Sequence, residues 1–260
     1  AVRSLFDALP ERILALGVLH SGGVEPYRVA LDDTQPAHRK SEAFAVVRGA
    51  FLRPEREADT PFGPVPSWRV PDLPDVVRLD RSGILDAEFS LDTFLTVCRA
   101  GADALGRSPI PVTAAYVGMT RDPVGGSFST AEELARWVGS QRDAGTAVVT
   151  TGDLVHYGTG YGPEWVPGKP SGLATLAEAI RPEVAACLEA ALARGDLEEA
   201  YSASRQRLLN DQREILPILA LCLGVPTRFA LLSFALSDYA PILGRAAPCG
   251  VAAALVRFGA

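Results

Sequence analysis

Four short apolar runs constrain the fold of this chain more than any other feature of its sequence. The first covers residues 13–19 and stops at His20-Ser21-Gly22-Gly23, and similar runs occupy 43–52, 112–117 and 147–151. A short apolar run that ends at glycines is typical of a strand buried on both faces, with a loop leaving its carboxyl end. We therefore expect a strand at each run, although Arg48 interrupts the second.

Signals for helices and loops occupy the other segments. Thr130-Ala131-Glu132-Glu133 has the pattern of a capping box, which predicts a helix from there to about Arg142. We also expect helices over 2–9, 88–105 and 197–209 and one opened by Pro182, strands over 227–236 and 250–258, and surface loops over 53–80 and 158–172. Strand–helix–strand order favours an α/β sheet whose functional loops gather at one edge.

Length and composition favour one globular domain. The chain has 260 residues, of which 48% are apolar and 22% charged, the profile of an ordinary globular protein. No internal repeat, low-complexity tract or linker divides it. We predict that residues 1–260 form a single α/β domain with a mixed central sheet flanked by helices.

Charge and hydropathy argue against two classes of partner. The net charge is −6 and no arginine stripe is present, whereas nucleic acid rewards concentrated positive charge. The longest strongly apolar run, between Glu214 and Arg228, has 13 residues with two prolines, too short for a bilayer core of about 30 Å. Four separated cysteines without a CxxC, and no opening signal segment, predict a cytoplasmic protein. The sequence leaves open whether the protein forms a homo-oligomer.

Two of the three histidines follow predicted strands. His20 comes directly after the first run, a position that in α/β sheets faces the crevice where ligands bind. A histidine that only caps the strand end is the alternative. His38 lies in residues 35–40, which we expect to form a polar loop, and we expect a solvated surface role for it.

His156 lies soon after the run at 147–151 and three residues beyond Asp153. In one helical turn this spacing puts both side chains on a common face, where the carboxylate orients the imidazole or raises its basicity. The alternative is that Asp153 caps the following turn while His156 packs in the interior.

Glu88 and Glu214 are the acidic candidates, because each stands at the border of a polar and an apolar segment. Capping explains Glu88 more simply, whereas Glu214 precedes the apolar segment 215–224, which must be buried. Two histidines and a carboxylate on separate loops would form the facial arrangement typical of non-haem iron. His20, His156 and Glu214 are therefore the candidate metal ligands.

Several segments, in chain order, resemble motifs of Memo-like proteins, the B component of the AmmeMemoRadiSam set. The residues at the end of the first run resemble a strand end "LGPSHH", and 60–66 resemble a loop "TPLGxVxVD". The most specific match is Asp153-Leu154-Val155-His156-Tyr157-Gly158, within a segment similar to "VVSSDLSHYG". Residues 88–92 are similar to "EHSLE" and residues 250–256 to a terminal "YAAGALTV".

The resemblance implies the α/β fold of class III extradiol dioxygenases, which hold Fe(II) with two histidines and a glutamate. It matches His20 to a metal ligand, His156 to a ligand or an acid/base, and Glu214 to the dioxygenase glutamate, where Memo-like proteins have a cysteine. Two departures stand out. Phe89 replaces the histidine of "EHSLE", and the family's first metal histidine, in an upstream strand, has no counterpart. Either that strand precedes Ala1 in a longer protein, or the chain is a degenerate member.

Two hypotheses for function follow from the resemblance. In the first, the protein is a Memo-like oxidoreductase that uses Fe(II) or Cu on a small-molecule substrate. His20 and Glu214 would hold the metal, His156 oriented by Asp153 would move protons, and the loop over 157–165 would wall the pocket. In the second, the protein is a metal-free binding or scaffold protein that keeps the fold without the catalysis.

Overall fold

A computed structural model of the chain describes residues 10–20, 23–86, 88–143, 145–158, 173–244 and 249–258, with the backbone alone at 173, 243 and 249–255. The predicted helix over 2–9 and nearly all of the predicted loop over 158–172 lie outside these residues. The chain divides into two compact units, Ala1–Thr151 and Gly152–Ala260. The single-domain prediction stays a prediction.

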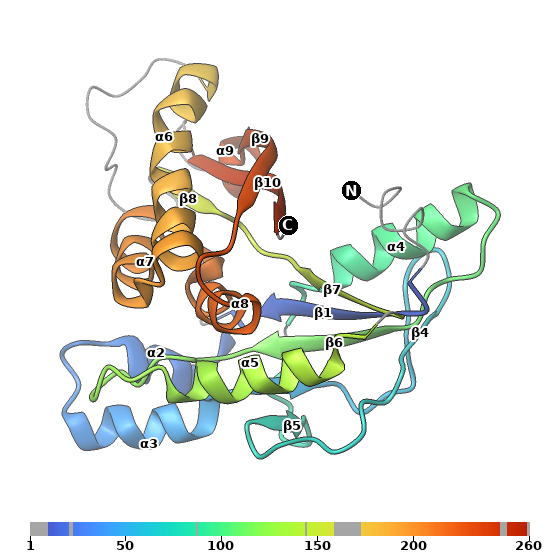
Figure 1. Cartoon of the computed structure of the whole chain (residues 1–260), viewed down its shortest axis with the longest axis horizontal. Coiled ribbons are helices and arrows are strands. Elements are labelled where there is room, and N and C mark those ends of the chain that lie inside the picture. The colour runs from blue at the N-terminus through green and yellow to red at the C-terminus, as the bar shows by residue number, and fades with distance from the viewer. Residues whose placement is uncertain are drawn as a thin grey trace. The chain divides into compact units, whose positions relative to one another are not determined.

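The first unit contains a mixed sheet flanked by helices, which confirms the predicted α/β class (Figure 1). The strand order is β5-β2-β6-β1-β7, in which β2 and β6 are antiparallel and the other neighbours are parallel. The strands are β1 (Arg12–Val18), β2 (Ala50–Leu52), β5 (Val77–Leu79), β6 (Val112–Val117) and β7 (Thr146–Thr150), and a separate pair joins β3 (Glu57–Ala58) to β4 (Val65–Pro66).

Strand β1 lies in the sheet between two parallel neighbours, and every residue from Ile13 to Leu19 is buried. This confirms the strand predicted from the continuous apolar run, because a strand covered on both faces has no polar alternation. The strands predicted at 112–117 and 147–151 are confirmed as β6 and β7. Their parallel alignment brings three carboxyl ends to one edge of the sheet.

The helices among the described residues of the first unit are α2 (Glu25–Leu31), α3 (Ala37–Val47), α4 (Asp92–Ala104) and α5 (Ser129–Gln141). Tyr27, Val47 and Leu95 bring α2, α3 and α4 into one hydrophobic cluster with Ile13 of β1. Helix α5 runs alongside β6 in Figure 1 and buries its own apolar stripe, which includes Leu134 and Val138. Burial of these stripes, more than helix propensity, stabilises the helices.

The strand predicted over 43–52 is wrong for its first half, which belongs to α3. The buried residues of this helix are Lys40, Ala43 and Val47, and this spacing is helical. The strand begins only after Gly49, whose φ of +88° suits glycine and whose missing Cβ lets the Val76 main chain approach. Ala43–Val47 and Ala50–Leu52 are both short and apolar. A prediction from composition alone therefore merged the end of a helix with a strand.

Two predicted helix starts are also wrong. Phe128 holds the N-cap position of α5 and no side-chain cap bond forms there, so Thr130 makes no capping box although the helix itself is confirmed. Pro182 does not open a helix but lies inside α6 (Leu173–Leu188). A proline fits the first turn of a helix best, yet here it occupies an interior position where one backbone hydrogen bond is lost.

The second unit combines a three-stranded antiparallel sheet with helices. The sheet order is β8-β10-β9, with β8 (Val155–Gly158), β9 (Phe229–Asp238) and β10 (Cys249–Phe258), so the two closing strands predicted from the sequence are confirmed. Helix α6 contacts β9 and continues into a π-helical segment, η2 (Glu189–Arg194). The remaining elements are α7 (Leu197–Ala203), π-helical η3 (Ser204–Leu208), η4 (Asp211–Arg213), α8 (Leu216–Leu223) and α9 (Ala240–Leu243).

Among the described residues, no helix combines the length and the apolar character that crossing a bilayer requires. The three cysteines whose side chains are described, Cys98, Cys187 and Cys222, are free thiols.

Candidate functional site

His20 lies just beyond the carboxyl end of β1, where it meets the segment that precedes α4. Ser90 ties this segment to the strand, because its hydroxyl donates to the Val18 carbonyl at 2.8 Å. Gly17 allows the approach, since a Cβ there would lie 2.7 Å from Cγ of Leu91. His20 therefore lies at the predicted edge of the sheet, and the segment before α4 is held against the end of its strand.

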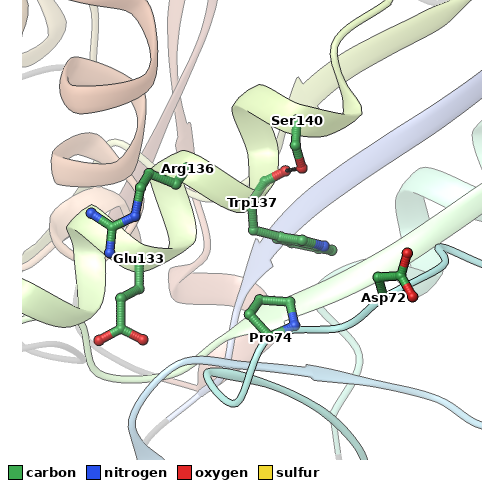
Figure 2. A pocket seen from close by; sticks show the side chains of 6 residues that line it. All are labelled: Asp72, Pro74, Glu133, Arg136, Trp137 and Ser140. Atoms are coloured by element: carbon green, nitrogen blue, oxygen red, sulfur yellow. Dashed lines mark hydrogen bonds between the residues drawn. The ribbon is translucent and has the colours of Figure 1, made fainter.

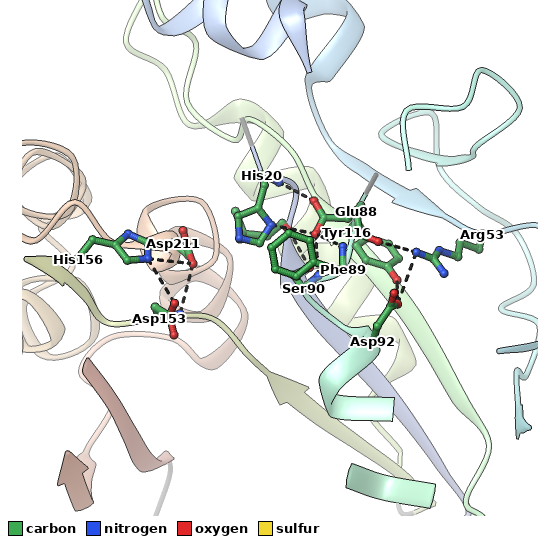
Figure 3. Close-up of polar contacts among 11 residues, drawn as sticks. His20, Arg53, Glu88, Phe89, Ser90, Asp92, Tyr116, Asp153, His156 and Asp211 are labelled. Carbon is green, nitrogen blue, oxygen red and sulfur yellow. Dashed lines mark hydrogen bonds and ion pairs between the residues drawn. The ribbon is translucent and has the colours of Figure 1, made fainter. Parts of the chain in front are cut away.

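The carboxylate of Glu88 is the polar partner of His20 (Figure 3). The Glu88 side chain is 2% exposed and accepts four N–H groups: the backbone and Nδ1 of His20 at 2.7 and 2.9 Å, and the backbones of Phe89 and Ser90 at 2.8 and 2.7 Å. Burial alone would raise the pKa of the Glu88 carboxyl, but these hydrogen bonds and the His20 charge lower it to about 2. Glu88 is thus ionised at neutral pH and joins two segments.

Neighbouring groups hold the rest of this cluster. The Phe89 ring is 61% exposed and stacks on the His20 imidazole, with centroids 4.8 Å apart and planes 12° apart. Arg53 donates to the Glu88 carbonyl at 2.7 Å and pairs with Asp92 at 3.5 Å. The buried hydroxyl of Tyr116 donates to the same Asp92 oxygen at 3.4 Å.

A second polar group, in the other unit, contains Asp153, His156 and Asp211 (Figure 3). His156 lies on β8, paired in register with Val251 of β10, so the sheet and not a helical turn fixes its ring. Its Nε2 lies 3.3 Å from Oδ2 of Asp153 and 4.0 Å from Oδ2 of Asp211. Its Nδ1 donates to the Leu209 carbonyl at 2.6 Å.

The segment that brings Asp211 to this group follows a residue in the left-handed conformation. The π-helical segment η3 ends at Leu209, a non-glycine residue in the left-handed region with φ of +50° and ψ of +34°. Two hydrogen bonds then join the segments around Asp153 and Asp211. The Asp211 N–H donates to the Asp153 carbonyl at 3.2 Å, and the Asp153 N–H donates to Oδ2 of Asp211 at 3.4 Å. Gly152 makes room for them, because a Cβ there would lie 2.5 Å from Nε2 of Gln212.

The electrostatics of this group favour a cation at Nε2. Burial alone would lower the pKa of His156, but the hydrogen bond to Asp153, the Asp211 charge and the Leu209 carbonyl together raise it. Both ring nitrogens therefore face acceptors. A carbonyl only accepts hydrogen bonds, so Nδ1 carries a proton, and Nε2 is left to hold a second proton or a metal ion between two carboxylates.

The structure brings some of the predicted site residues together and separates others. Asp153 and His156 are in contact as predicted, although the helical turn invoked for them is wrong. Glu214, a predicted metal ligand, is fully buried, and its Oε1 accepts from the Tyr201 hydroxyl at 3.3 Å and from Arg213 at 3.4 Å. It is not part of the Asp153–His156–Asp211 group. His38 is exposed as expected, but it lies on α3 and not in the predicted loop.

Asp211 is the residue that the sequence reasoning missed. It occurs in Asn210-Asp211-Gln212, a short polar segment with no recognisable spacing to His156. The polar signal was present, but only the left-handed turn at Leu209 aims this carboxylate at the imidazole. Of the aromatic residues predicted to wall the pocket, Tyr157 lies on β8 and is buried, and the others lie outside the described residues.

A pocket of about 340 Å³ lies elsewhere in the first unit (Figure 2). The Trp137 indole lies beside Pro74 in this view, and the charged residues of the wall are Asp72, Glu133 and Arg136. None of the predicted site residues lines it, so it is not the site that the sequence indicated.

A scan against protein-family models finds no match for this chain, and a search of curated proteins finds none either. The fold and the polar groups define a mixed α/β protein with a candidate metal centre in its second unit. The resemblance to Memo-like proteins stays a prediction carried by the motifs.

Proposed function

We propose that this chain is a Memo-like, divalent-metal-dependent protein that acts on a small molecule, with Asp153, His156 and Asp211 as its metal ligands. The extradiol-dioxygenase form of the α/β fold is part of this proposal. The observation that supports it is the convergence of one imidazole nitrogen and two carboxylates, whose donor atoms lie within 4.8 Å of one another.

The two distances from Nε2 of His156 suit a first-row divalent ion. Ligand bonds of about 2.0–2.2 Å leave two ligand atoms at most about 4.4 Å apart. The two carboxylate oxygens lie 3.3 and 4.0 Å from Nε2, inside this limit. The donation from Nδ1 to the Leu209 carbonyl is the kind of contact that orients a ligating histidine and leaves Nε2 for the metal.

The donor set differs from the two histidines and one glutamate that the resemblance implies. One imidazole with two carboxylates is a harder set, which favours Fe(II), Mn(II) or Zn(II) over Cu(I). A bound ion would supply open coordination positions for a small molecule. The chain would supply a neutral His156, held by Leu209, and two carboxylates that offset the charge of the ion.

The metal-free binding protein is the second candidate, and one observation favours it. A proton on Nε2 satisfies the same geometry, because an imidazolium can donate to Asp153 at 3.3 Å without any metal. The substitution of Phe89 for the motif histidine agrees with this alternative.

Calorimetric titration of chelator-treated protein with Mn(II), Zn(II) and, without oxygen, Fe(II) separates the two candidates. We expect one ion per chain and at least about tenfold weaker binding in Asp211→Asn and His156→Ala. Glu178→Gln, an exposed carboxylate of α6, is the matched control and should bind as the unmodified protein does. Glu214→Gln tests the sequence prediction in the same series. Absence of binding, or equal affinity in all variants, would leave the metal-free function.

A further inference from the structure

The pocket of the first unit has an unsatisfied hydrogen-bond donor in its wall. Trp137, on α5, is 4% exposed, and its Nε1–H is buried without a hydrogen-bond acceptor among the described residues. The other described tryptophan, Trp68, donates the same group to the Ile13 carbonyl at 2.8 Å. Buried N–H groups are nearly always paired, because an unpaired one costs stability. An acceptor for the Trp137 indole is therefore expected from a molecule that enters the pocket.

Hydrogen bonds hold the backbone on both sides of this pocket. On α5, the Ser140 hydroxyl donates to the Trp137 carbonyl at 2.7 Å (Figure 2). In the segment before β5, the Pro74 carbonyl accepts from the Val77 N–H at 2.8 Å. Asp72 in the same segment has φ of +51°, a left-handed conformation that aspartate tolerates better than most residues. The wall therefore has a defined backbone before a ligand binds.

The other polar side chains of the wall complete two donor–acceptor pairs. In Figure 2 the nitrogen-bearing edge of the Trp137 indole lies toward Asp72, whose carboxylate only accepts hydrogen bonds. On the other side of Trp137 in this view, the Arg136 guanidinium only donates and the Glu133 carboxylate only accepts. Each side of the pocket thus offers one donor and one acceptor to a ligand.

A hydroxyl group matches such a pair, because it accepts one hydrogen bond and donates another. An ammonium group could not accept from the indole, and an anion would meet the two carboxylates of the wall against one guanidinium. The volume of about 340 Å³ is at the lower end of the range of about 300–1,000 Å³ for small-ligand sites. These features fit a small neutral molecule with several hydroxyl groups.

We propose that this pocket binds a small neutral polyol, such as a monosaccharide, whose hydroxyl groups bridge the two donor–acceptor pairs. One hydroxyl accepts from the Trp137 indole N–H and donates to the Asp72 carboxylate, which gives the buried indole its partner. A second accepts from the Arg136 guanidinium and donates to the Glu133 carboxylate. Binding exchanges hydrogen bonds with water for these, so we expect a Kd in the millimolar range. The proposal is independent of the metal site, because all these residues belong to the first unit.

NMR of the indole N–H groups tests the proposal in the presence of EDTA. In protein with ¹⁵N-labelled tryptophan, Trp137→Phe assigns the Trp137 resonance among the three that the chain can give. The probes are glycerol, myo-inositol, D-ribose, D-glucose and D-galactose up to about 100 mM, with tetramethylammonium and acetate as charged comparisons. We expect at least one polyol to move the Trp137 indole proton downfield to saturation, because a new hydrogen bond deshields it. Absence of a saturable shift with every polyol, or an equal response to either ion, would overturn the proposal.

A matched pair of variants tests the wall itself. Asp72→Asn keeps a residue that tolerates the left-handed conformation but removes the charge that strengthens the contact with a hydroxyl. Asp75→Asn changes an exposed carboxylate of the same segment that does not line the pocket. We expect the affinity for the saturating polyol to fall at least about threefold in Asp72→Asn and to stay unchanged in Asp75→Asn. Equal affinities in the two variants would overturn the proposed bridge. The EDTA keeps this result separate from that of the metal titration.

Discussion

The two histidine clusters share one half of their geometry and differ in the other. In both, Nδ1 donates to a fixed acceptor, the Glu88 carboxylate for His20 and the Leu209 carbonyl for His156. At Nε2 they part. His156 directs this atom at two carboxylates, whereas the carboxylate of the His20 cluster is used at Nδ1. The negative charge thus lies beside Nε2 in the His156 cluster, where it favours a cation, and beside Nδ1 in the His20 cluster.

Burial adds a second difference. Glu88 is almost inaccessible and accepts four hydrogen bonds, whereas the Asp153 side chain is 38% exposed and its contact with His156 is long, at 3.3 Å. A buried charge is held only when its partners are in place, and loss of a partner is costly there. Exposed charges exchange with water at little cost. The first cluster should therefore matter for folding and the second for ligand affinity.

The largest expected effect is on stability, from Glu88→Ala compared with Asp153→Ala. We expect Glu88→Ala to lower the free energy of unfolding by about 3–5 kcal/mol, because it leaves buried N–H donors unpaired. Asp153→Ala should cost less than about 1 kcal/mol. Urea denaturation measures both, with the exposed Glu42→Ala as the control. Equal losses of unfolding free energy in Glu88→Ala and Asp153→Ala would remove the distinction between the clusters.

The loss of stability in acid should reveal the contribution of the Glu88 carboxylate. The pKa of Glu88 is lowered from its ordinary 4.5 to about 2, so its stabilisation is present above pH 4.5 and is lost as pH falls through about 2. The corresponding loss is about 3 kcal/mol. Unfolding at a series of pH values should show this slope, and Glu88→Gln should flatten it. An unchanged slope in the variant would assign the acid sensitivity to other groups.

A smaller effect of opposite sign is expected from His156 in chelator-treated protein. Its pKa is raised, so the stabilisation from its imidazolium is present below the ordinary value of about 6.5 and is lost as pH rises through the folded-state pKa. Melting temperatures above pH 6 should therefore decline, and less steeply in Asp153→Asn. A decline of the same steepness in that variant would show that Asp153 does not hold the proton.

The smallest effect concerns Leu209. Leu209→Gly relieves a left-handed conformation that leucine rarely adopts, while glycine adds freedom to the unfolded chain. These terms oppose each other, so stability should change by less than about 1 kcal/mol, measured in urea. The carbonyl that accepts from His156 is kept, and the histidine titration followed by NMR should not move. A displaced titration would mean that the leucine side chain, and not the carbonyl, holds the ring.

Much of the first unit could be predicted because its signals are local. The runs at β1, β6 and β7 are short and apolar, and such runs form strands when both faces are covered. The same rule failed at 43–52, where α3 ends and β2 begins within one apolar stretch. Pro182 misled for a related reason, since a favourable position in a helix is a tendency that tertiary packing overrides.

The candidate sites could be predicted only in part. Local spacing identified Asp153 with His156, and the end of a buried strand identified His20. It could not find their decisive partners. Glu88 is 68 residues from His20, and Leu209 is 53 residues from His156. Glu214 shows the opposite failure. Its place beside an apolar segment suggested a metal ligand, but in the structure it accepts hydrogen bonds from Tyr201 and Arg213.

The sequence by itself therefore determined the longer strands β1, β6, β7, β9 and β10, the helices α4, α5 and α7, and the histidines that follow apolar runs, because periodicity and apolar burial act over a few neighbouring residues. It did not find β5, β8, α2 or α3. Tertiary structure alone decided where negative charge lies around each imidazole. That choice depends on backbone geometry that no local pattern encodes: the close approach at Gly17, and the left-handed turn at Leu209 that precedes Asp211. The described partners of each histidine follow from those two features of the backbone.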